Sequence, residues 1–162
     1  MRLTLLTAVL LAVPVVAADP EIKLEQTNLD GLLKAIEAHK GKIVVVDVWA
    51  NFCQPCKEKF PHMVKLHNDL AEQGVVFISL SVDDLDDKAA SLEFLKKNKA
   101  TFQNFILADK DRNEEAGDKK LYHSIPPIVH VFDRSGAKVK TYESKKESAA
   151  LDGLLKELLE KK

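Results

Sequence analysis

The most informative segment of the chain reads VDVWANFCQPCK and covers residues 46–57. It begins inside a nearly continuous β-branched run, residues 43–48, which is typical of a strand buried on both faces of a sheet. From about Cys53 to Gln73 polar residues separate the apolar ones, which predicts a helix, and Gly74 is placed to end it. Both cysteines of the chain therefore lie where a buried strand gives way to a helix.

The spacing and placement of Cys53 and Cys56 favour redox chemistry. Cys53 would lie at the helix N-terminus, where free N–H groups and the helix dipole stabilise a thiolate. Cys56 would lie one turn later and more deeply buried. A Cys53 thiolate can attack a disulfide in a partner, and Cys56 can then attack the mixed disulfide and release the reduced product. The short spacing makes this second attack intramolecular and fast.

Other interpretations of the cysteines are weaker. A structural disulfide that closes so short a loop would stabilise the fold little. A zinc site needs further ligands, and the chain has no third cysteine. Its histidines show no paired ligand spacing: His39, His62, His67, His123 and His130. We therefore expect a redox-active disulfide, no metal and no other cofactor.

The rest of the chain alternates between strand and helix patterns. Further strands are expected at 75–82, 105–108, 128–132 and 138–142, and further helices near Leu29, near Asp86 and after Ser144. This order implies an α/β fold in which a central mixed sheet carries helices on both faces. The charged stretch 110–120 is expected to be a solvated loop or a frayed helix.

The N-terminus has the three parts of a secretory signal. Arg2 gives a positive start, residues 3–11 are mostly apolar, and small residues before Asp19 suit a cleavage site. A membrane anchor is the alternative, but the apolar run is shorter than the about 20 residues that span a bilayer. We expect residues 1–18 to be a signal peptide, residues 19–162 to be one domain, and the protein to be periplasmic or otherwise extracytoplasmic.

The composition limits the kinds of partner. Lys and Arg number 24 against 25 Asp and Glu, a net charge of −1, and so balanced a chain does not suit nucleic-acid binding. With 162 residues, 46% of them hydrophobic, the chain can bury one core. We expect a monomer that binds no nucleic acid.

The segment 46–57 resembles the active-site segment of thioredoxin-fold proteins. Its continuation EKFPHM, residues 58–63, is similar to the extracytoplasmic thiol-disulfide oxidoreductases of the TlpA/ResA type. In that group the motif helix commonly reads C-x-P-C-(K/R)-x-E-x-P. Pro61 matches this pattern, whereas Lys59 stands at the usual Glu.

The resemblance covers the chain from about Leu24 to its end. It implies a thioredoxin-like fold with an N-terminal extension and a helix-strand insertion between Asp83 and Asp109. The segment 109–122 does not align cleanly with the family, and residues 142–144 stand where a Gly often follows the last hairpin. The substrate-binding rim is therefore the part that the resemblance defines least.

The resemblance also implies roles for four residues. Cys53 would be the nucleophile and Cys56 the resolving thiol, and Asp47 would be a buried proton acceptor beneath the second cysteine. A carboxylate within a run of valines is costly to bury without a partner or a function. A solvent-facing Asp at a strand end is the alternative. Trp49 would pack beside the disulfide and contact substrate, or it would be a core residue, or both.

Ile125-Pro126-Pro127 is the candidate for the family's cis-proline loop, which would bind the substrate peptide. The preceding Ser-Ile favours Pro126 as the cis residue, and so does chemistry, because a proline before the cis residue offers no N–H to a bound peptide. The position of Asp133, six residues after Pro127, favours Pro127. Both registers remain open, as does a trans Pro-Pro pair that enters an edge strand.

The dipeptide Gln54-Pro55 bears on the direction of electron flow. It has no cationic or histidine side chain to stabilise a Cys53 thiolate strongly, which favours a reductant over a strong oxidant. The resemblance then implies a membrane thiol-disulfide electron donor and disulfide-containing protein substrates, such as those of cytochrome c maturation. The alternatives are a disulfide oxidase or isomerase and a copper-binding module that adds His123 or His130 to the cysteines. A peroxidase is least favoured, because residues 44–52 contain neither Pro nor Thr.

Overall fold

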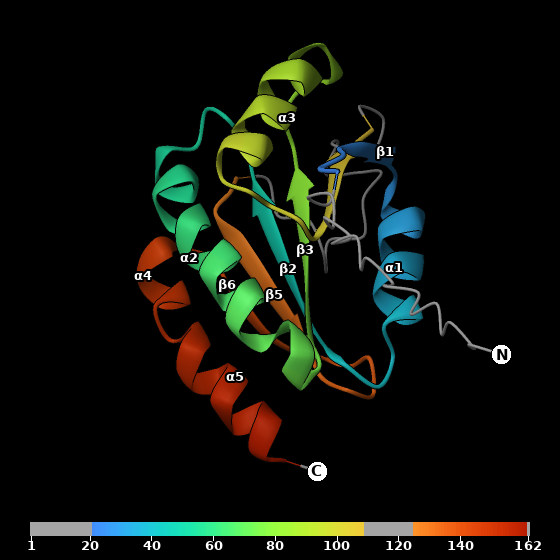
Figure 1. Ribbon diagram of the computed structural model, residues 1–162, viewed down its shortest axis with the longest axis vertical. Coiled ribbons are helices and arrows are strands. Elements are labelled where there is room, and N and C mark those ends of the chain that lie inside the picture. Colours follow the sequence, from blue (N-terminus) through green and yellow to red (C-terminus); the bar gives the residue numbers. More distant parts are fainter. Residues whose placement is uncertain (1–20, 109–124, 162) are drawn as a thin grey trace, which may run out of the picture.

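The structure, a computed structural model, describes residues 21–108 and 125–161. Within these residues six strands form one sheet in the order β1-β4-β3-β2-β5-β6 (Figure 1). The first four strands of that order are parallel, and β5 and β6 are antiparallel to their neighbours. The strands are β1 (Glu25–Thr27), β2 (Ile43–Trp49), β3 (Val75–Ser81), β4 (Gln103–Leu107), β5 (Ile128–Phe132) and β6 (Lys138–Tyr142).

Strand β2 lies near the middle of the sheet, and all seven of its residues are buried, as its valine run predicts. It pairs with β3 in parallel and with β5 in antiparallel orientation, with Val48 opposite Ile128. The end of β2 and the start of β5 therefore meet at one edge of the sheet. This register brings the cysteine segment and the proline loop, far apart in sequence, to the same edge.

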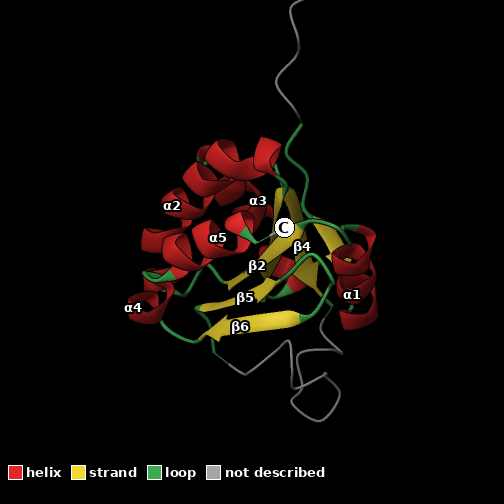
Figure 2. Cartoon of the chain, turned by 90° about the horizontal axis from the view of Figure 1, so that it is seen from below, coloured by secondary structure: helices red, strands yellow, loops and turns green. Residues whose placement is uncertain are grey.

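Helices cover both faces of the sheet (Figures 1 and 2). The helix α1 lies on one face, and α2, α3 and α5 lie on the other. Crossovers between parallel strands are right-handed, so the direction of travel across the sheet decides which face the connecting helix covers. From β2 to β3 to β4 the chain moves in one direction, which places α2 and α3 on the same face. From β1 to β2 it moves in the opposite direction, which places α1 on the other face. The helices are α1 (Leu29–Ala38), α2 (Gln54–Leu70), α3 (Lys88–Lys97), α4 (Lys145–Ser148) and α5 (Leu151–Glu160), with 3₁₀ turns at Ala71–Gln73 and Leu85–Asp87.

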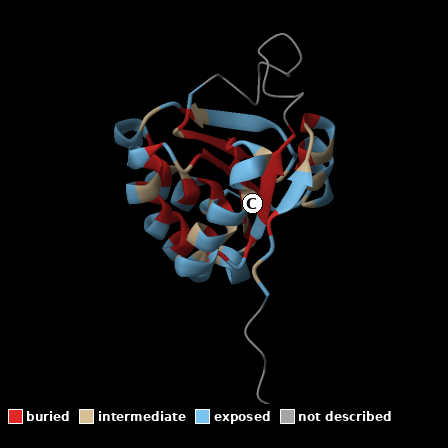
Figure 3. Cartoon of the chain, turned by 90° about the horizontal axis from the view of Figure 1, so that it is seen from above, coloured by how far each residue is buried: buried red, intermediate tan, exposed pale blue. Residues whose placement is uncertain are grey.

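Aromatic side chains fill the layer between the sheet and helices α2 and α3. The ring of Trp49, at the end of β2, lies 5.3 Å from that of Phe60 on α2 and 4.8 Å from that of Phe94 on α3. Phe60 and Phe94 also meet edge to face at 5.1 Å. Buried residues gather in this layer and in the sheet (Figure 3). The packing fixes the first turns of α2, and with them the cysteines, against β2.

The predicted architecture is confirmed, and its boundaries differ in places. The mixed sheet, the helices on both faces and the helix and strand between Asp83 and Asp109 are present. Gly74 has φ +90° and ends the helical segment, as expected. The three-residue β1 was not predicted, because its half-exposed pattern carries no strand signal and its pairing with β4 holds it. The last helix is divided in two after Ser148.

Two predictions fall outside the described residues. These are the signal peptide at 1–18 and the loop or frayed helix at 110–120, and both stay predictions. Among residues 21–108 and 125–161, no helix is both long enough and apolar enough to cross a membrane.

Candidate active site

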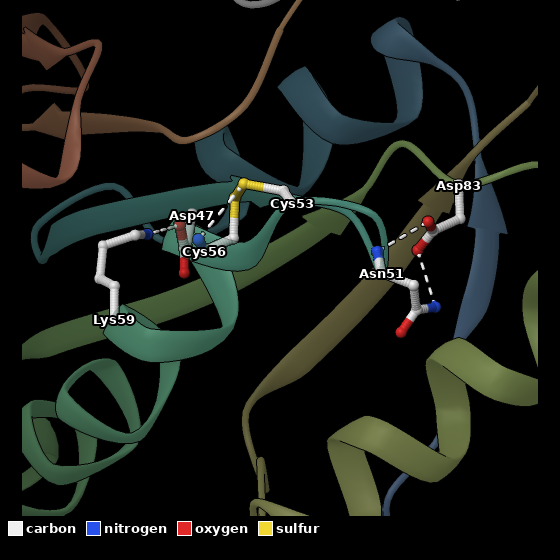
Figure 4. The surroundings of a disulfide bond; sticks show 6 residues. All are labelled: Asp47, Asn51, Cys53, Cys56, Lys59 and Asp83. Carbon is white, nitrogen blue, oxygen red and sulfur yellow. Dashed lines mark hydrogen bonds and ion pairs between the residues drawn. A yellow bond between two sulfur atoms is a disulfide. The ribbon is translucent and has the colours of Figure 1, made fainter.

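A disulfide joins Cys53 to Cys56 at the start of α2, with an S–S distance of 2.00 Å and a Cα–Cα distance of 5.3 Å (Figure 4). Cys53 is the N-cap residue of this helix, and its Sγ accepts a hydrogen bond from the N–H of Cys56 at 3.2 Å. Pro55 occupies the first turn, where its missing N–H costs no helical hydrogen bond. The local sequence thus presents Cys53 to the positive end of the helix dipole.

The two cysteines differ in exposure. Cys56 is fully buried, whereas Cys53 keeps 5% of its surface exposed. Cys53 is therefore the residue of the pair that a group from outside the protein can approach more readily. This difference supports the predicted division of roles between nucleophile and resolving thiol.

Asp47 lies inside the protein, so the alternative of a solvent-facing carboxylate at a strand end is wrong. Its side chain is 2% exposed, and its Oδ1 forms an ion pair with Nζ of Lys59 on α2, whose side chain is 5% exposed. Its Oδ2 has no hydrogen-bond partner among the described residues. Burial raises the pKa of Asp47, and the charge and the hydrogen bond of Lys59 act in the opposite direction.

The ion pair lies beside the disulfide. Cys56 and Lys59 are three residues apart on α2 and therefore share one face of the helix. That face points at β2, because Lys59 reaches Asp47 there. In Figure 4 the two charged side chains meet next to Cys56. Sequence analysis recorded Lys59 as a departure from the family pattern but did not foresee its pairing with Asp47.

A second buried carboxylate, Asp83, holds the loop before Cys53. The backbone N–H of Asn51 donates to Oδ1 of Asp83 at 2.8 Å, and its side-chain amide donates to Oδ2 at 3.1 Å. The hydroxyls of Ser81 and Ser91 donate to the same Oδ2, each at 2.8 Å. These bonds tie the active-site loop to the end of β3 and to α3. Sequence analysis missed this network, and only the position of Asp83 directly after a buried strand could have indicated it.

The aromatic residues on either side of the loop have different environments. Trp49 is fully buried against Phe60 and Phe94, so in this conformation it is a core residue, and a contact with substrate through it stays a prediction. Phe52, directly before Cys53, is 71% exposed. Sequence analysis did not single out Phe52, yet it places an exposed aromatic side chain next to Cys53 in the sequence.

The proline loop lies at the sheet edge that carries the disulfide loop, as the pairing of Val48 with Ile128 requires. The cis bond joins Pro126 to Pro127, so Pro127 is the cis residue and the register favoured by Asp133 is the one observed. Ile125 is 74% exposed, while Pro126 is buried. The loop thus offers an apolar side chain to solvent near the disulfide.

Residues proposed as metal ligands are not gathered at the disulfide in the part of the chain that the structure describes. No group of three or more His, Cys, Asp or Glu side chains that could hold a metal ion occurs among those residues. His130 is buried in β5, and its Nδ1 lies 2.9 Å from Oγ1 of Thr141. His123 lies outside the described residues, so the copper-binding alternative stays untested.

Known proteins are similar to this chain in sequence and in fold. The sequence profile of the AhpC/TSA family matches residues 17–120. The thiol-disulfide oxidoreductase ResA of Bacillus thuringiensis subsp. konkukian is 29% identical over 133 residues, which cover 82% of this chain and 72% of that protein. ResA of Bacillus subtilis is 32% identical over 93 residues, which cover 57% and 49%.

A solved structure supports the same fold. A thiol-disulfide isomerase from Corynebacterium glutamicum superimposes with a TM-score of 0.63 at 24% identity and covers 78% of this chain and 86% of that chain. The fold is therefore thioredoxin-like, as the sequence predicted.

Proposed function

The chain belongs to the AhpC/TSA family, and on that premise we propose that it is a thiol-disulfide oxidoreductase that reduces disulfides in partner proteins through Cys53 and Cys56. One observation carries the proposal: the two cysteines form a disulfide at a helix N-terminus, and only Cys53 keeps surface exposed. The resemblance to proteins named thiol-disulfide oxidoreductase ResA supports the same chemistry.

In the first step the Cys53 thiolate attacks one sulfur of the partner's disulfide. A bond forms between Cys53 and that sulfur, and the partner's other sulfur leaves as a thiolate. The free N–H groups of the first turn of α2 stabilise the attacking thiolate. The exposed side chains of Phe52, directly before Cys53, and Ile125, on the proline loop, offer the partner an apolar surface.

In the second step Cys56 attacks the Cys53 sulfur of the mixed disulfide. Its thiol must lose a proton, and Asp47 is the acceptor, because its Oδ2 lacks a hydrogen-bond partner among the described residues. The Cys53–Cys56 disulfide forms, and the partner's remaining sulfur leaves as a thiolate. Two electrons have then passed to the partner, and the protein is in the oxidised state that the structure describes.

The oxidised pair must be reduced again for another turnover. We propose a membrane thiol-disulfide donor as the source of electrons, and an extracytoplasmic site of action that the predicted signal peptide would give. The neutral dipeptide Gln54-Pro55 supports a reductant, because nothing in it stabilises the Cys53 thiolate strongly. Proteins of cytochrome c maturation are the candidate substrates, and the protein acts as a monomer.

The reduction potential of the Cys53–Cys56 pair tests this proposal, measured by equilibration with glutathione or dithiothreitol. A value near about −250 mV or lower, in the range of thioredoxin, supports a reductase. A value near about −120 mV overturns that direction and makes the protein an oxidase. Cys56→Ser is the control, because it cannot form the internal disulfide.

A further inference from the structure

Lys59 is an unusual residue to find inside a protein. Long cationic side chains are seldom buried unless they are paired, because leaving water costs free energy. Among the described residues Lys59 is the only Lys or Arg that is buried. Its one ion-pair partner in that part of the chain is Asp47, the residue to which we assign proton transfer.

We propose that Lys59 is a positioning residue that keeps Asp47 ionised and thereby sets the pH range in which Cys56 resolves the mixed disulfide. This inference rests on the proposed function, since it concerns the second step of that reaction. It also rests on a side chain of this particular chain, because Lys59 stands where the resembling family commonly has Glu.

The geometry gives Lys59 this role. Its Nζ contacts Oδ1 of Asp47 and leaves Oδ2 without a hydrogen-bond partner among the described residues. One carboxylate oxygen is thus held by the cation, and the other remains available to a proton. Cys56 lies one turn before Lys59 on the same helix face, so its thiol and the ammonium approach the carboxylate from the same side.

Among the described residues, the neighbouring strands place no other charge opposite Asp47. In register with Asp47 lie Ser79 on β3 and Val129 on β5, both neutral. Tyr142 on β6 is paired with Val129 and faces the same side of the sheet, one strand further away. Its phenol stays neutral near pH 7, because burial raises its pKa.

Among the described residues, the first turns of α2 carry further titratable groups: the two cysteines, Lys57 and the half-exposed Glu58. Glu58 pairs with Lys145. Glu58 directs its charge to that surface pair and not to the buried carboxylate. Lys59 is therefore the cation on which the ionisation of Asp47 depends, because burial alone favours the neutral acid.

The release of thionitrobenzoate from 5,5′-dithiobis(2-nitrobenzoate) separates the two steps in the full-length reduced protein. The first equivalent reports attack by Cys53, and the second reports resolution by Cys56, which Cys56→Ser should abolish. We compare Lys59→Gln, which retains a hydrogen-bond donor without the charge, with Lys59→Arg, which restores the charge. Lys65→Gln is the matched control, because it removes an exposed Lys–Asp ion pair from the same helix.

In Lys59→Gln we expect the second phase to slow at least about tenfold at pH 7 and its pH midpoint to rise by at least about one unit, while the first phase changes less than about threefold. Lys59→Arg should return the midpoint toward that of the wild type, and Lys65→Gln should not move it. A merely structural role of Lys59 would leave the midpoint in place. Coincident pH profiles of wild type and Lys59→Gln would overturn the inference and leave the proposed function standing.

If the wild-type protein releases no second equivalent, the proposed function fails and this inference fails with it. If Lys59→Gln does not fold, the comparison of wild type with Lys59→Arg decides. A folded Lys59→Arg whose midpoint rises as far as one unit contradicts a role for the charge.

Discussion

Replacing Asp83 by Ala should destabilise the protein and loosen the loop that carries Cys53. Asp83 is 2% exposed, and within the described part of the chain its carboxylate accepts hydrogen bonds from the backbone and amide of Asn51 and from Ser81 and Ser91. The substitution removes the shared acceptor of all four bonds. It leaves the donors in place, and a buried donor that has lost its acceptor lowers the free energy of unfolding.

The magnitude follows from which donors find another acceptor. The Ser91 hydroxyl can keep the carbonyl oxygen of Asp87 at 3.2 Å, and the Asn51 amide can keep Ser91 Oγ at 2.7 Å. The backbone N–H of Asn51 and the fully buried hydroxyl of Ser81 lose their acceptor. Two unsatisfied donors at about 1–3 kcal/mol each predict a loss of roughly 2–6 kcal/mol in the free energy of unfolding.

Urea unfolding of the oxidised protein, followed by the fluorescence of Trp49, measures this loss. With a slope of about 2 kcal/mol/M, the midpoint should fall by roughly 1–3 M. Asp86→Ala, an exposed Asp three residues along, is the matched control and should stay within about 0.5 kcal/mol of the wild type. If Asp83→Ala unfolds at the same urea concentration as Asp86→Ala, the network does not hold the loop and the reasoning is refuted.

Three further predictions concern the site itself. Cys56→Ser should accumulate a mixed disulfide with a protein substrate, visible by mass spectrometry, whereas Cys53→Ser should accumulate none. In Lys59→Met, Asp47 keeps the burial that raises its pKa and loses the cation, so the free energy of unfolding should fall as pH rises from about 4 to 8, by about 3–5 kcal/mol. Urea unfolding across that range should show no such fall once Asp47→Asn is added. Phe52→Ser should slow the reduction of insulin by roughly tenfold through lost apolar contact and leave the reaction with a small disulfide unchanged.

The central part of the fold could be predicted because its signals are local. The valine run predicts β2 and Gly74 predicts the end of the helical segment, each from a few adjacent residues. The structure has both features. Strand β1 could not be predicted, because three residues with two exposed side chains give no alternation to recognise. It forms because it pairs with β4, which lies far along the chain, so no local sequence pattern predicts it.

The candidate site divides in the same way. The spacing of Cys53 and Cys56 and the cost of an acid among valines indicated the disulfide and the burial of Asp47. The ion-pair partner of Asp47 depends on how α2 packs against β2, and this packing could not be predicted from the sequence. Asp83 is one of several acidic residues between β3 and α3, and only the three-dimensional arrangement separates it from its exposed neighbours.

Two buried carboxylates flank one disulfide, and their surroundings suit them to different tasks. Both oxygens of Asp83 accept hydrogen bonds from neutral donors, so the side chain is held in place. Asp47 has one oxygen held by a cation and the other unpartnered among the described residues. A carboxylate with both oxygens hydrogen-bonded suits the positioning of the loop, whereas an ionised acid with a vacant lone pair suits proton transfer. The same residue type therefore supplies rigidity on one side of the cysteines and chemistry on the other, because hydrogen-bond saturation distinguishes the two.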